Sequence, residues 1–277
     1  MQNLVSQLLN YVPLVALAYG LLLLLAAAFQ RRLLYFPPRG YPVTPAALGL
    51  PFAAEEVTTS DGLRLAAWWV PGEKAGAPVL LYFHGNAANL SSLVELAPAF
   101  RAAGFSFAAV DYRGYGTNPG RPTEAGLRRD AMAAWEWALR HGVPPGRVVV
   151  YGQSLGAGVA AWLASQVPCG GLVLESSFPS VYAMSRLHYP FLWLPEFAIL
   201  DRYPAAADAA RAKCPVLVLH GELDAVSPVA FGRRVFEAAR EPKRFMVVPG
   251  ADHNSIEPRL PVVRAALEEF RKICGLR

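Results

Sequence analysis

The first thirty residues of the chain carry no charged side chain, and the whole chain has only three cysteines, Cys169, Cys214 and Cys274. The cysteines are far apart and odd in number. They therefore supply neither the disulfide framework of a small secreted domain nor the paired spacing of a metal site. We expect all three to be structural.

A concentrated basic surface is also missing. The net charge is +5 and the isoelectric point is near 9.2, but the cations are scattered and almost all are arginine. No basic stripe with interleaved aromatic residues occurs, so we predict no nucleic-acid partner. A mild attraction to anionic lipid headgroups fits the charge, as does a compositional preference for arginine. We find no internal repeat.

What the amino terminus does contain is a long apolar run. Tyr11 to Phe29 is interrupted only by Pro13 and Gly20, and a helix rising about 1.5 Å per residue could cross a hydrocarbon core of about 30 Å over this length. We predict a transmembrane anchor and basic flank over residues 1–32. A cleaved signal peptide is the alternative suggested by Ala26–Ala28, but no Lys or Arg precedes the run. A buried core helix is disfavoured because such helices seldom lack polar residues all round.

The residues that follow the apolar run are typical of a membrane interface. Arg31 and Arg32 come first, and Tyr35 and Phe36 follow shortly. The positive-inside rule predicts a single-pass protein of the inner or plasma membrane whose carboxyl-terminal bulk is cytoplasmic. Several prolines within residues 33–54 predict an interfacial linker.

From residue 55 the chain has the pattern of an α/β domain. Asp61-Gly62 predicts a hairpin between two alternating segments. Continuous apolar strands and helical segments then alternate, which predicts a mostly parallel sheet covered by helices on both faces, with its ligand site at the carboxyl ends of the strands. The predicted strands are Glu55–Thr59, Leu63–Val70, Val79–Phe83, Ser106–Val110, Val148–Tyr151, Gly171–Leu174, Pro215–His220 and Arg244–Val248. The predicted helices are Leu93–Ala103, Thr123–His141, Ala157–Gln166, Val229–Ala239 and Val262–Cys274.

A serine follows the third of the parallel strands in the sequence Gly152-Gln153-Ser154-Leu155-Gly156. This is the G-x-S-x-G elbow, in which a strand turns sharply into a helix and presents the serine at the tip. The two glycines allow the strand and the helix to approach closely. We predict that Ser154 is a nucleophile. The alternative is a Gly-rich turn with an exposed serine.

The loop after Val79–Phe83 contains small residues whose backbone amides are free to point into a cleft, as an oxyanion hole requires. We predict that the amides of Asn86 and Leu155 form this hole. His84 lies in the same loop. It precedes the serine in the chain, and we interpret it as a brace for the loop rather than a catalytic base.

Two later strand ends supply the other members of a triad. Asp224 stands clear of the turn after Pro215–His220, with Glu222 as its substitute. His253 follows the last strand in a loop of small residues, and it completes the order Ser, Asp, His that an α/β-hydrolase topology requires. Asp252 is badly directed to orient the neighbouring ring and is interpreted as structural.

Polar residues follow two further strands. Asp111 and Arg113 are interpreted as holding a Gly-rich turn through charge-assisted hydrogen bonds. Glu175, Ser176 and Ser177 are candidates for lining the site, although neither serine has the flanking glycines of a nucleophile.

The segment from residue 178 to 213 is too long for a simple loop, and we predict that it forms a short cap over the site. We expect its aromatic residues to bind an acyl chain that enters directly from lipid. The alternative is that they only cover the edge of the sheet. The candidate substrate-binding residues are Phe178, Tyr182, Tyr189, Phe191 and Trp193.

Taken together, FHGNAAN, DYRGYG, GQSLG, HGELDAVSP and the terminal DHN resemble the α/β-hydrolase fold serine hydrolases, and more narrowly the membrane-anchored abhydrolase-domain lipid hydrolases and their bacterial relatives. The resemblance covers residues 55–277 and implies catalysis by Ser154, Asp224 and His253 without a metal or organic cofactor.

The activity that the resemblance implies is hydrolysis of carboxylic esters by a serine carboxylesterase or lipase. Its substrates are expected to be lipid-derived, such as monoacylglycerols or lysophospholipids. Three alternatives are a depalmitoylase-like thioesterase, a peptidase of the same fold, and a membrane-tethered interaction protein with a non-catalytic hydrolase fold. The peptidase is disfavoured because the chain has no room for a propeller or a larger cap.

Overall fold

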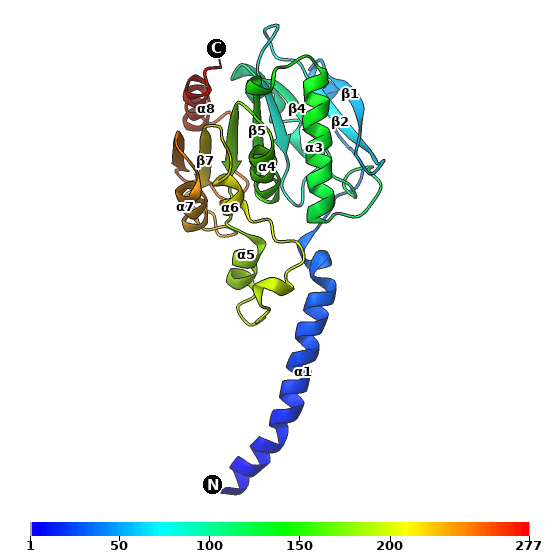
Figure 1. Ribbon diagram of the computed structural model, residues 1–277, viewed down its shortest axis with the longest axis vertical. Coiled ribbons are helices and arrows are strands. Elements are labelled where there is room, and N and C mark those ends of the chain that lie inside the picture. The colour runs from blue at the N-terminus through cyan, green and yellow to red at the C-terminus, as the bar shows by residue number, and fades with distance from the viewer. Residues whose placement is uncertain (1, 277) are drawn as a thin grey trace.

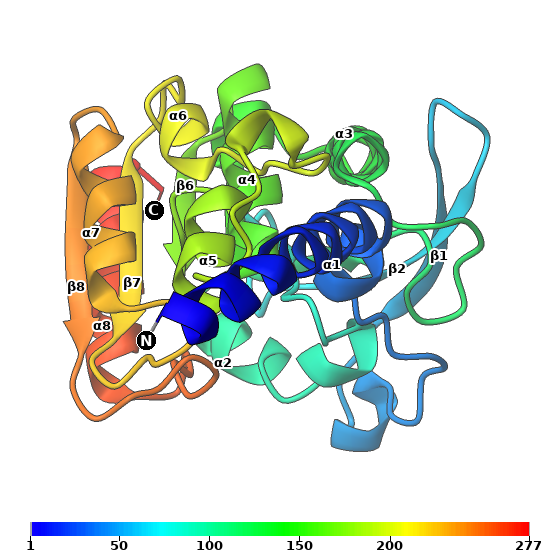
Figure 2. The same cartoon turned by 90° about the horizontal axis from the view of Figure 1, so that it is seen from below.

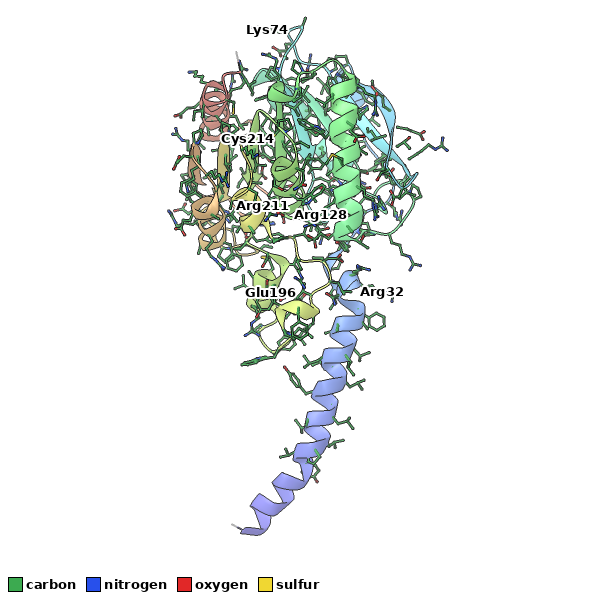
Figure 3. The ribbon with its side chains drawn as sticks, in the orientation of Figure 1. Arg32, Lys74, Arg128, Glu196, Arg211 and Cys214 are labelled. Atoms are coloured by element: carbon green, nitrogen blue, oxygen red, sulfur yellow. The ribbon has the colours of Figure 1, made fainter. Side chains whose placement is uncertain are left out.

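A computed structural model describes residues 2–276, with side chains from residue 11 onward. The long helix α1 (Gln2–Leu34) projects away from an α/β domain that contains the rest of the chain (Figure 1). Residues Tyr11–Leu34 of this helix are long and apolar enough to cross a membrane, and an 18-residue window within them has a mean hydropathy of 2.4. Where the side chains of α1 are described, Tyr11, Leu14 and Leu17 are 62%, 62% and 71% exposed, and the helix there projects away from the domain (Figure 3).

The domain is built on one sheet of eight strands in the order β1-β2-β4-β3-β5-β6-β7-β8. β1 and β2 form an antiparallel hairpin, β2 is also antiparallel to β4, and the remaining neighbours are parallel. The predicted strands are confirmed, with ends that differ by no more than two residues. The strands are β1 (Ala53–Thr58), β2 (Arg64–Val70), β3 (Val79–Phe83), β4 (Ser106–Val110), β5 (Val148–Gln153), β6 (Gly171–Glu175), β7 (Val216–Gly221) and β8 (Lys243–Val248).

Helices cover both faces of the sheet, as predicted. Alternate residues of each strand enter two separate apolar cores. Leu81 of β3 joins the core beneath α3, α4 and α7, whereas Leu80 joins the core beneath α2 and α8. The helices are α2 (Ala97–Ala102), α3 (Glu124–Arg140), α4 (Leu155–Gln166), α5 (Val181–His188), α6 (Ala205–Ala209), α7 (Val229–Ala238) and α8 (Pro261–Ile273), and the short 3₁₀ turns are η1 (Pro45–Leu48), η2 (Leu90–Leu93), η3 (Pro145–Arg147) and η4 (Glu196–Ala198).

The helix predicted over Leu93–Ala103 was partly wrong, because α2 begins only at Ala97. The preceding residues form η2, which the Asn89 side chain caps by accepting a hydrogen bond from the Ser91 amide. Asn and Asp side chains favour such local bonds over a regular helix.

The register of the parallel strands brings their carboxyl ends to one edge of the sheet. Phe83 of β3 pairs with Gly152 of β5, and Gln153 pairs with Glu175 of β6. This edge faces α1 and α5, and Figure 2, seen from below, shows α1 crossing in front of it. Loops far apart in the sequence therefore meet beneath α1.

The insertion between β6 and β7 has two parts. Its first part contains α5 and η4 and lies below the sheet edge, beside α1 (Figure 1). Its last part, α6, is buried against the body of the domain, where Ala205 and Ala209 are inaccessible to solvent. We therefore propose that the cap comprises only residues 178–204 of the segment 178–213.

The second half of α1 packs against this cap. The Arg31 guanidinium pairs with the buried Asp201 carboxylate at 2.8 Å, and the Gln30 side chain accepts a hydrogen bond from the Leu200 amide at 2.8 Å. Nearer the free end of the helix, the Tyr19 hydroxyl donates to the Phe191 carbonyl at 2.8 Å. α1 therefore bonds to the cap at Tyr19 and again at Gln30 and Arg31, whereas the residues from Tyr11 to Leu17 are exposed.

Candidate active site

Ser154 stands at the junction of β5 and α4 in a strained conformation. Its φ of 52° and ψ of −115° lie outside the regions that non-glycine residues prefer. The sequence favours this turn because a Cβ atom at Gly152 would overlap the backbone of Gly156, and one at Gly156 would overlap the backbone of Phe83. The Ser154 amide donates to the Glu175 carbonyl at 2.9 Å, which fixes the turn to β6.

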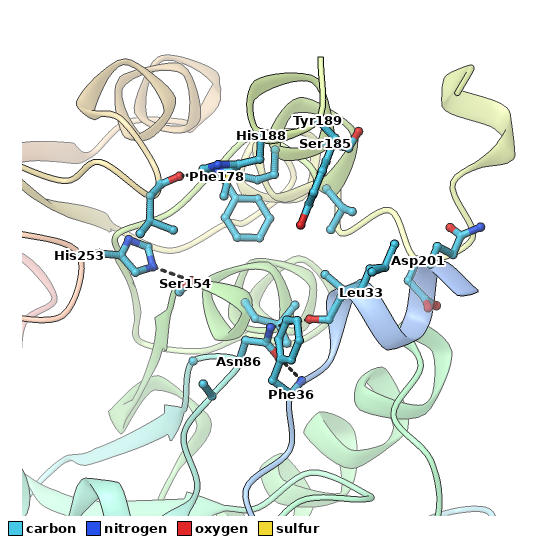
Figure 4. A pocket seen from close by; sticks show the side chains of 18 of the residues that line it. Leu33, Phe36, Asn86, Ser154, Phe178, Ser185, His188, Tyr189, Asp201 and His253 are labelled. Atoms are coloured by element: carbon cyan, nitrogen blue, oxygen red, sulfur yellow. Dashed lines mark hydrogen bonds between the residues drawn. The ribbon is translucent and has the colours of Figure 1, made fainter. Parts of the chain in front are cut away.

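The structure brings the three predicted triad residues together. His253 Nε2 lies 2.9 Å from Ser154 Oγ (Figure 4), and His253 Nδ1 lies 2.7 Å from Asp224 Oδ2. Both His253 and Asp224 are buried. An imidazole held in this way can accept the serine proton while the carboxylate orients the ring.

The environment of Asp224 keeps its carboxylate ionised. Burial alone would raise the pKa of Asp224, but hydrogen bonds from His220, His253 and the Ser227 amide outweigh burial and hold that pKa well below its usual range. The Ser227 and Val226 amides both donate to Asp224 Oδ1, at 2.7 and 3.0 Å. Asp224 is therefore a fixed negative charge beside the imidazole.

His220 is a part of the site that the sequence analysis missed. Its ring is fully buried, with Nε2 3.4 Å from Asp224 Oδ2 and 2.6 Å from the Ser227 carbonyl. A Cβ atom at Gly232 of α7 would overlap this ring. The signal available was the histidine at the end of β7, four residues before Asp224.

The rival acids and the rival base lie elsewhere. Glu222 accepts a hydrogen bond from the Gly250 amide at 2.9 Å, and Asp252 accepts one from the Asn254 amide at 2.9 Å. Neither carboxylate bonds to His253. The interpretation of His84 as a brace agrees with the geometry, because its buried ring bonds to the Gly85 carbonyl at 2.8 Å.

The two proposed oxyanion amides flank the serine. Leu155 is the first residue of α4, and Asn86 lies in the loop after β3. Both residues line the same pocket as Ser154. The structure thus places both predicted residues at the cavity that contains Ser154.

Asp111 and Arg113 do not bond to each other, and each holds a different part of the chain near the site. Arg113 pairs with Asp61 at 2.8 Å and with Asp130 at 2.7 Å. Asp111 instead accepts a hydrogen bond from the Leu90 amide at 2.7 Å. The prediction of charge-assisted bonds in this turn is thus confirmed for Arg113, whereas Asp111 holds the loop after β3.

Glu175 lies beneath the serine turn, outside the pocket lining. Its fully buried carboxyl accepts hydrogen bonds from the Tyr151 hydroxyl and, at 2.9 Å, from the Gln153 side chain. Burial raises the pKa of Glu175 to about 7, although these two bonds act to lower it. Ser176 and Ser177 are also buried and do not line the pocket.

A cavity of about 700 Å³ opens over Ser154. Two of the five candidate cap residues, Phe178 and Tyr189, line it (Figure 4). The prediction was wrong for Tyr182, Phe191 and Trp193, which are not among its lining residues. Phe191 and Trp193 are 57% and 70% exposed and face outward, because the loop that follows α5 turns away from the sheet.

One wall of the cavity was not predicted, because it comes from the end of the predicted anchor and the start of the predicted linker, for which no part in the site was expected. Figure 4 shows Leu33 and Phe36 facing the cavity. The wall residues from α1 and the residues just after it are Ala26, Gln30, Leu33, Leu34 and Phe36, and the other apolar lining residues include Val181, Met184, Leu192, Leu194, Ile199 and Val226.

The cysteines are free thiols, as expected. Cys169 and Cys214 nevertheless lie close together, with their sulfur atoms 3.4 Å apart in the core. Their separation of forty-five positions in the chain gave no sign of this contact. Within residues 2–276, no group of three or more His, Cys, Asp or Glu side chains is arranged to hold a metal ion.

Comparison with known proteins places the chain in a family. The family model of the alpha/beta hydrolase fold matches residues 78–196. The uncharacterized protein Rv2307c of Mycobacterium tuberculosis is 43% identical over 268 residues, covering 95% of this chain and 94% of the relative. The alpha/beta hydrolase domain-containing protein WAV2 of Arabidopsis thaliana is 32% identical, covering 83% of this chain and 82% of the relative. The chain therefore belongs to the α/β-hydrolase family and is a hydrolase.

Two further similarities concern proteins with a stated activity. The lysophosphatidylserine lipase ABHD12 of Danio rerio is 31% identical over 198 residues, which cover 64% of this chain and 51% of the relative. The solved structure of the Pyrococcus furiosus esterase Pf2001 superimposes with a TM-score of 0.69 at 20% identity, covering 86% of this chain and 97% of the esterase. At that identity the superposition establishes the fold alone.

Proposed function

We propose that the protein is a membrane-anchored serine hydrolase that cleaves carboxylic esters of lipid origin through an acyl-enzyme on Ser154. The observation that carries the proposal is the chain of short contacts from Ser154 Oγ to His253 and from His253 to Asp224, at 2.9 and 2.7 Å, on the floor of an apolar cavity. Serine, histidine and an ionised carboxylate in this geometry form a nucleophile with its base.

The proposed mechanism follows from these positions. His253 takes the proton of Ser154 as the serine oxygen attacks the ester carbonyl. The amides of Asn86 and Leu155 stabilise the negative charge that develops on the carbonyl oxygen. The protonated His253 then gives its proton to the leaving alcohol. A water molecule activated by the same imidazole attacks the acyl-enzyme and releases the carboxylic acid.

The cavity favours an acyl chain over a polar substrate. Its walls are mainly aliphatic and aromatic, with Ser154 and His253 at the sheet edge and a few polar side chains, among them Gln30, Ser185 and His188, from α1 and the cap. A volume of about 700 Å³ is within the range of small-molecule sites. The similarity to a protein named lysophosphatidylserine lipase supports a lipid-derived ester.

The position of the cavity supports access from a bilayer. Phe191, Trp193 and Phe197 of the cap are 57%, 70% and 80% exposed. The Tyr19 hydroxyl of α1 bonds to the backbones of Phe191 and Trp193 at 2.8 and 3.2 Å, which places this part of the cap beside the apolar helix. In a bilayer that α1 crossed, these rings would lie at the membrane surface, and aromatic side chains favour the membrane interface. Arg31 and Arg32 on the domain side of α1 support placement of the domain in the cytoplasm.

The test is hydrolysis of p-nitrophenyl esters from acetate to palmitate by the full-length protein in detergent. We expect activity that peaks at medium or long chains and that Ser154→Ala reduces by about 10³-fold or more at every length. Ser165→Ala on the same helix is the matched control, because its hydroxyl bonds only to the Trp162 carbonyl and the Gln166 side chain.

A thioester series of the same chain lengths separates an esterase from a thioesterase. Higher kcat/KM for the thioesters throughout would replace the ester proposal by the depalmitoylase-like alternative. Absence of hydrolysis in both series would favour an interaction protein with a non-catalytic fold.

A further inference from the structure

The residues that follow α1 are fastened to the loop that carries the proposed oxyanion amide. We call residues 34–43 the strap and residues 85–92 the oxyanion loop. Side chains of the loop bond to the backbone of the strap at three successive places. These places are Asn86 with Leu34 and Phe36, Asn89 with Gly40 at 2.8 Å, and Ser91 with Val43 at 2.8 and 2.9 Å.

Asn86 has the most complete set of bonds. Its side-chain amide donates to the Leu34 carbonyl, and its side-chain oxygen accepts from the Phe36 amide at 3.1 Å (Figure 4). The same oxygen accepts from the Tyr115 hydroxyl at 2.9 Å. Both acceptor positions of the side-chain oxygen are thus occupied, and one amide proton is used as well. The side chain of Asn86 therefore has one available orientation.

The opposite side of the loop is held by the body of the domain. The buried His84 ring bonds to the Gly85 carbonyl at 2.8 Å, and Asp111 accepts from the Leu90 amide at 2.7 Å. Between these two fixed points stand Asn86, Ala87, Ala88 and Asn89, and Ala87 is exposed. The Ala88 amide donates to the Gly85 carbonyl at 3.3 Å, and the Asn89 side chain donates to Gly40 of the strap. The side-chain bonds of Asn86 therefore fasten this stretch at the residue whose backbone amide is proposed to bind the oxyanion.

We propose that the strap positions the oxyanion hole through the Asn86 side chain. This inference rests on the proposed function, because it assumes that the Asn86 backbone amide stabilises the oxyanion. If the strap positions the oxyanion hole, residues 34–43 are required for hydrolysis of every ester. This includes short esters, which need neither the membrane nor the cavity wall that α1 contributes. Asn86 then has two roles: its amide contacts the substrate, and its side chain is a positioning group.

The test uses the full-length protein in detergent with p-nitrophenyl butyrate. Asn86→Ala keeps the backbone amide and removes the three side-chain bonds, whereas Tyr115→Phe removes only one. We expect Asn86→Ala to lower kcat by about 10-fold to 100-fold, since a misplacement of about 1 Å can have an effect of this size. Tyr115→Phe should lower kcat by roughly twofold to fivefold. KM should stay within about twofold for both variants, because the acyl site is unchanged.

A second readout separates positioning from a general loss of structure. An alkyl trifluoromethyl ketone forms a tetrahedral adduct with the serine and places an oxyanion in the hole. We expect Asn86→Ala to weaken its binding by about the same factor as kcat. Binding of butyrate, which forms no such adduct, should not change. Gln166→Ala removes a side-chain amide far from the loop and serves as the control.

The possible outcomes distinguish failure of the strap inference from failure of the proposed function. If the wild-type protein hydrolyses butyrate esters and Asn86→Ala has the same kcat and ketone affinity, the strap inference is wrong and the proposed function stands. If Asn86→Ala does not fold, Tyr115→Phe decides: an unchanged kcat overturns the inference, and a reduced kcat with unchanged KM supports it. Absence of ester hydrolysis in the wild type would overturn the proposed function and this inference with it.

Discussion

The floor and the roof of the cavity are built differently. The floor consists of loops at the carboxyl edge of the sheet, where Ser154, Asp224 and His253 hold one another through short bonds and the last two are buried. The roof consists of the cap and the second half of α1, which join through few bonds and expose many apolar side chains. The difference suggests that chemistry depends on the floor and substrate choice on the roof.

The largest expected effect is on the floor. Asp224→Asn removes the charge that orients His253 and stabilises its protonated form. We expect kcat to fall by about 10³-fold to 10⁴-fold for esters of every chain length. A fall in kcat confined to long-chain esters would contradict the assignment of chemistry to the floor and of substrate choice to the roof. Glu222→Gln, at the nearby but unconnected carboxylate, is the matched control and should retain wild-type kcat.

On the roof, Ala26→Phe places a ring in the wall that α1 contributes. We expect kcat/KM for palmitate esters to fall by about 10-fold or more while that for acetate esters changes less than about twofold, since only the deeper part of the cavity is filled. Leu17→Phe, on the part of α1 that does not line the cavity, is the control. Equal losses at both chain lengths would show that α1 is not a selective wall.

The floor should also differ from the roof in its response to pH. Because burial raises the pKa of Glu175 to about 7, the folded protein keeps a proton that the unfolded chain releases above its ordinary pKa of about 4.5. The contribution of Glu175 to stability should therefore be greatest below about pH 4.5 and should decline between about pH 4.5 and pH 7.

Glu175→Gln removes this ionisation. Its one acceptor oxygen can keep the bond from Gln153, and its NH₂ group donates to the Tyr151 hydroxyl oxygen in place of the bond that Tyr151 donated. We expect the free energy of unfolding of the variant relative to wild type to rise by about 2.5 kcal/mol between pH 5 and pH 8. Thermal unfolding at both pH values measures the difference as a shift of several degrees in Tm. A shift that is the same at pH 5 and pH 8 would show that Glu175 does not titrate in this range.

The smallest effect belongs to the outer roof. Tyr19→Phe removes the hydroxyl that bonds to the Phe191 carbonyl at 2.8 Å and to the Trp193 amide at 3.2 Å. Each exposed bond of this kind contributes about 1 kcal/mol or less. We expect faster proteolysis of the loop between α5 and η4 and less than about a threefold change in kcat/KM for long esters. A large loss of kcat/KM for acetate esters would contradict the assignment of chemistry to the floor and of substrate choice to the roof.

The floor could be predicted from the sequence because each of its parts is a local signal. The apolar strands, the glycines around Ser154 and the order of Ser154, Asp224 and His253 are visible in short windows. Parallel strands necessarily bring their carboxyl ends together. His220 escaped notice because its role depends on the room left by Gly232, which lies on a different element.

The roof could not be predicted in the same way, because its contacts join residues that are far apart in the chain. Hydropathy gives Leu17 and Ala26 the same interpretation, yet Ala26 lines the cavity and Leu17 is 71% exposed. Likewise, composition alone did not distinguish Phe178, which faces the serine, from Trp193, which faces outward. A membrane-spanning helix and the wall of an acyl pocket require the same side chains.

The most direct test of the central claim is to label the full-length protein with a fluorophosphonate and to locate the adduct by peptide mass spectrometry. A phosphonylated serine requires a nucleophile activated by its base. We predict a single adduct, on Ser154, that is lost in Ser154→Ala and strongly reduced in His253→Ala. Absence of labelling in the wild type, or an adduct on another serine that persists in Ser154→Ala, would contradict the account.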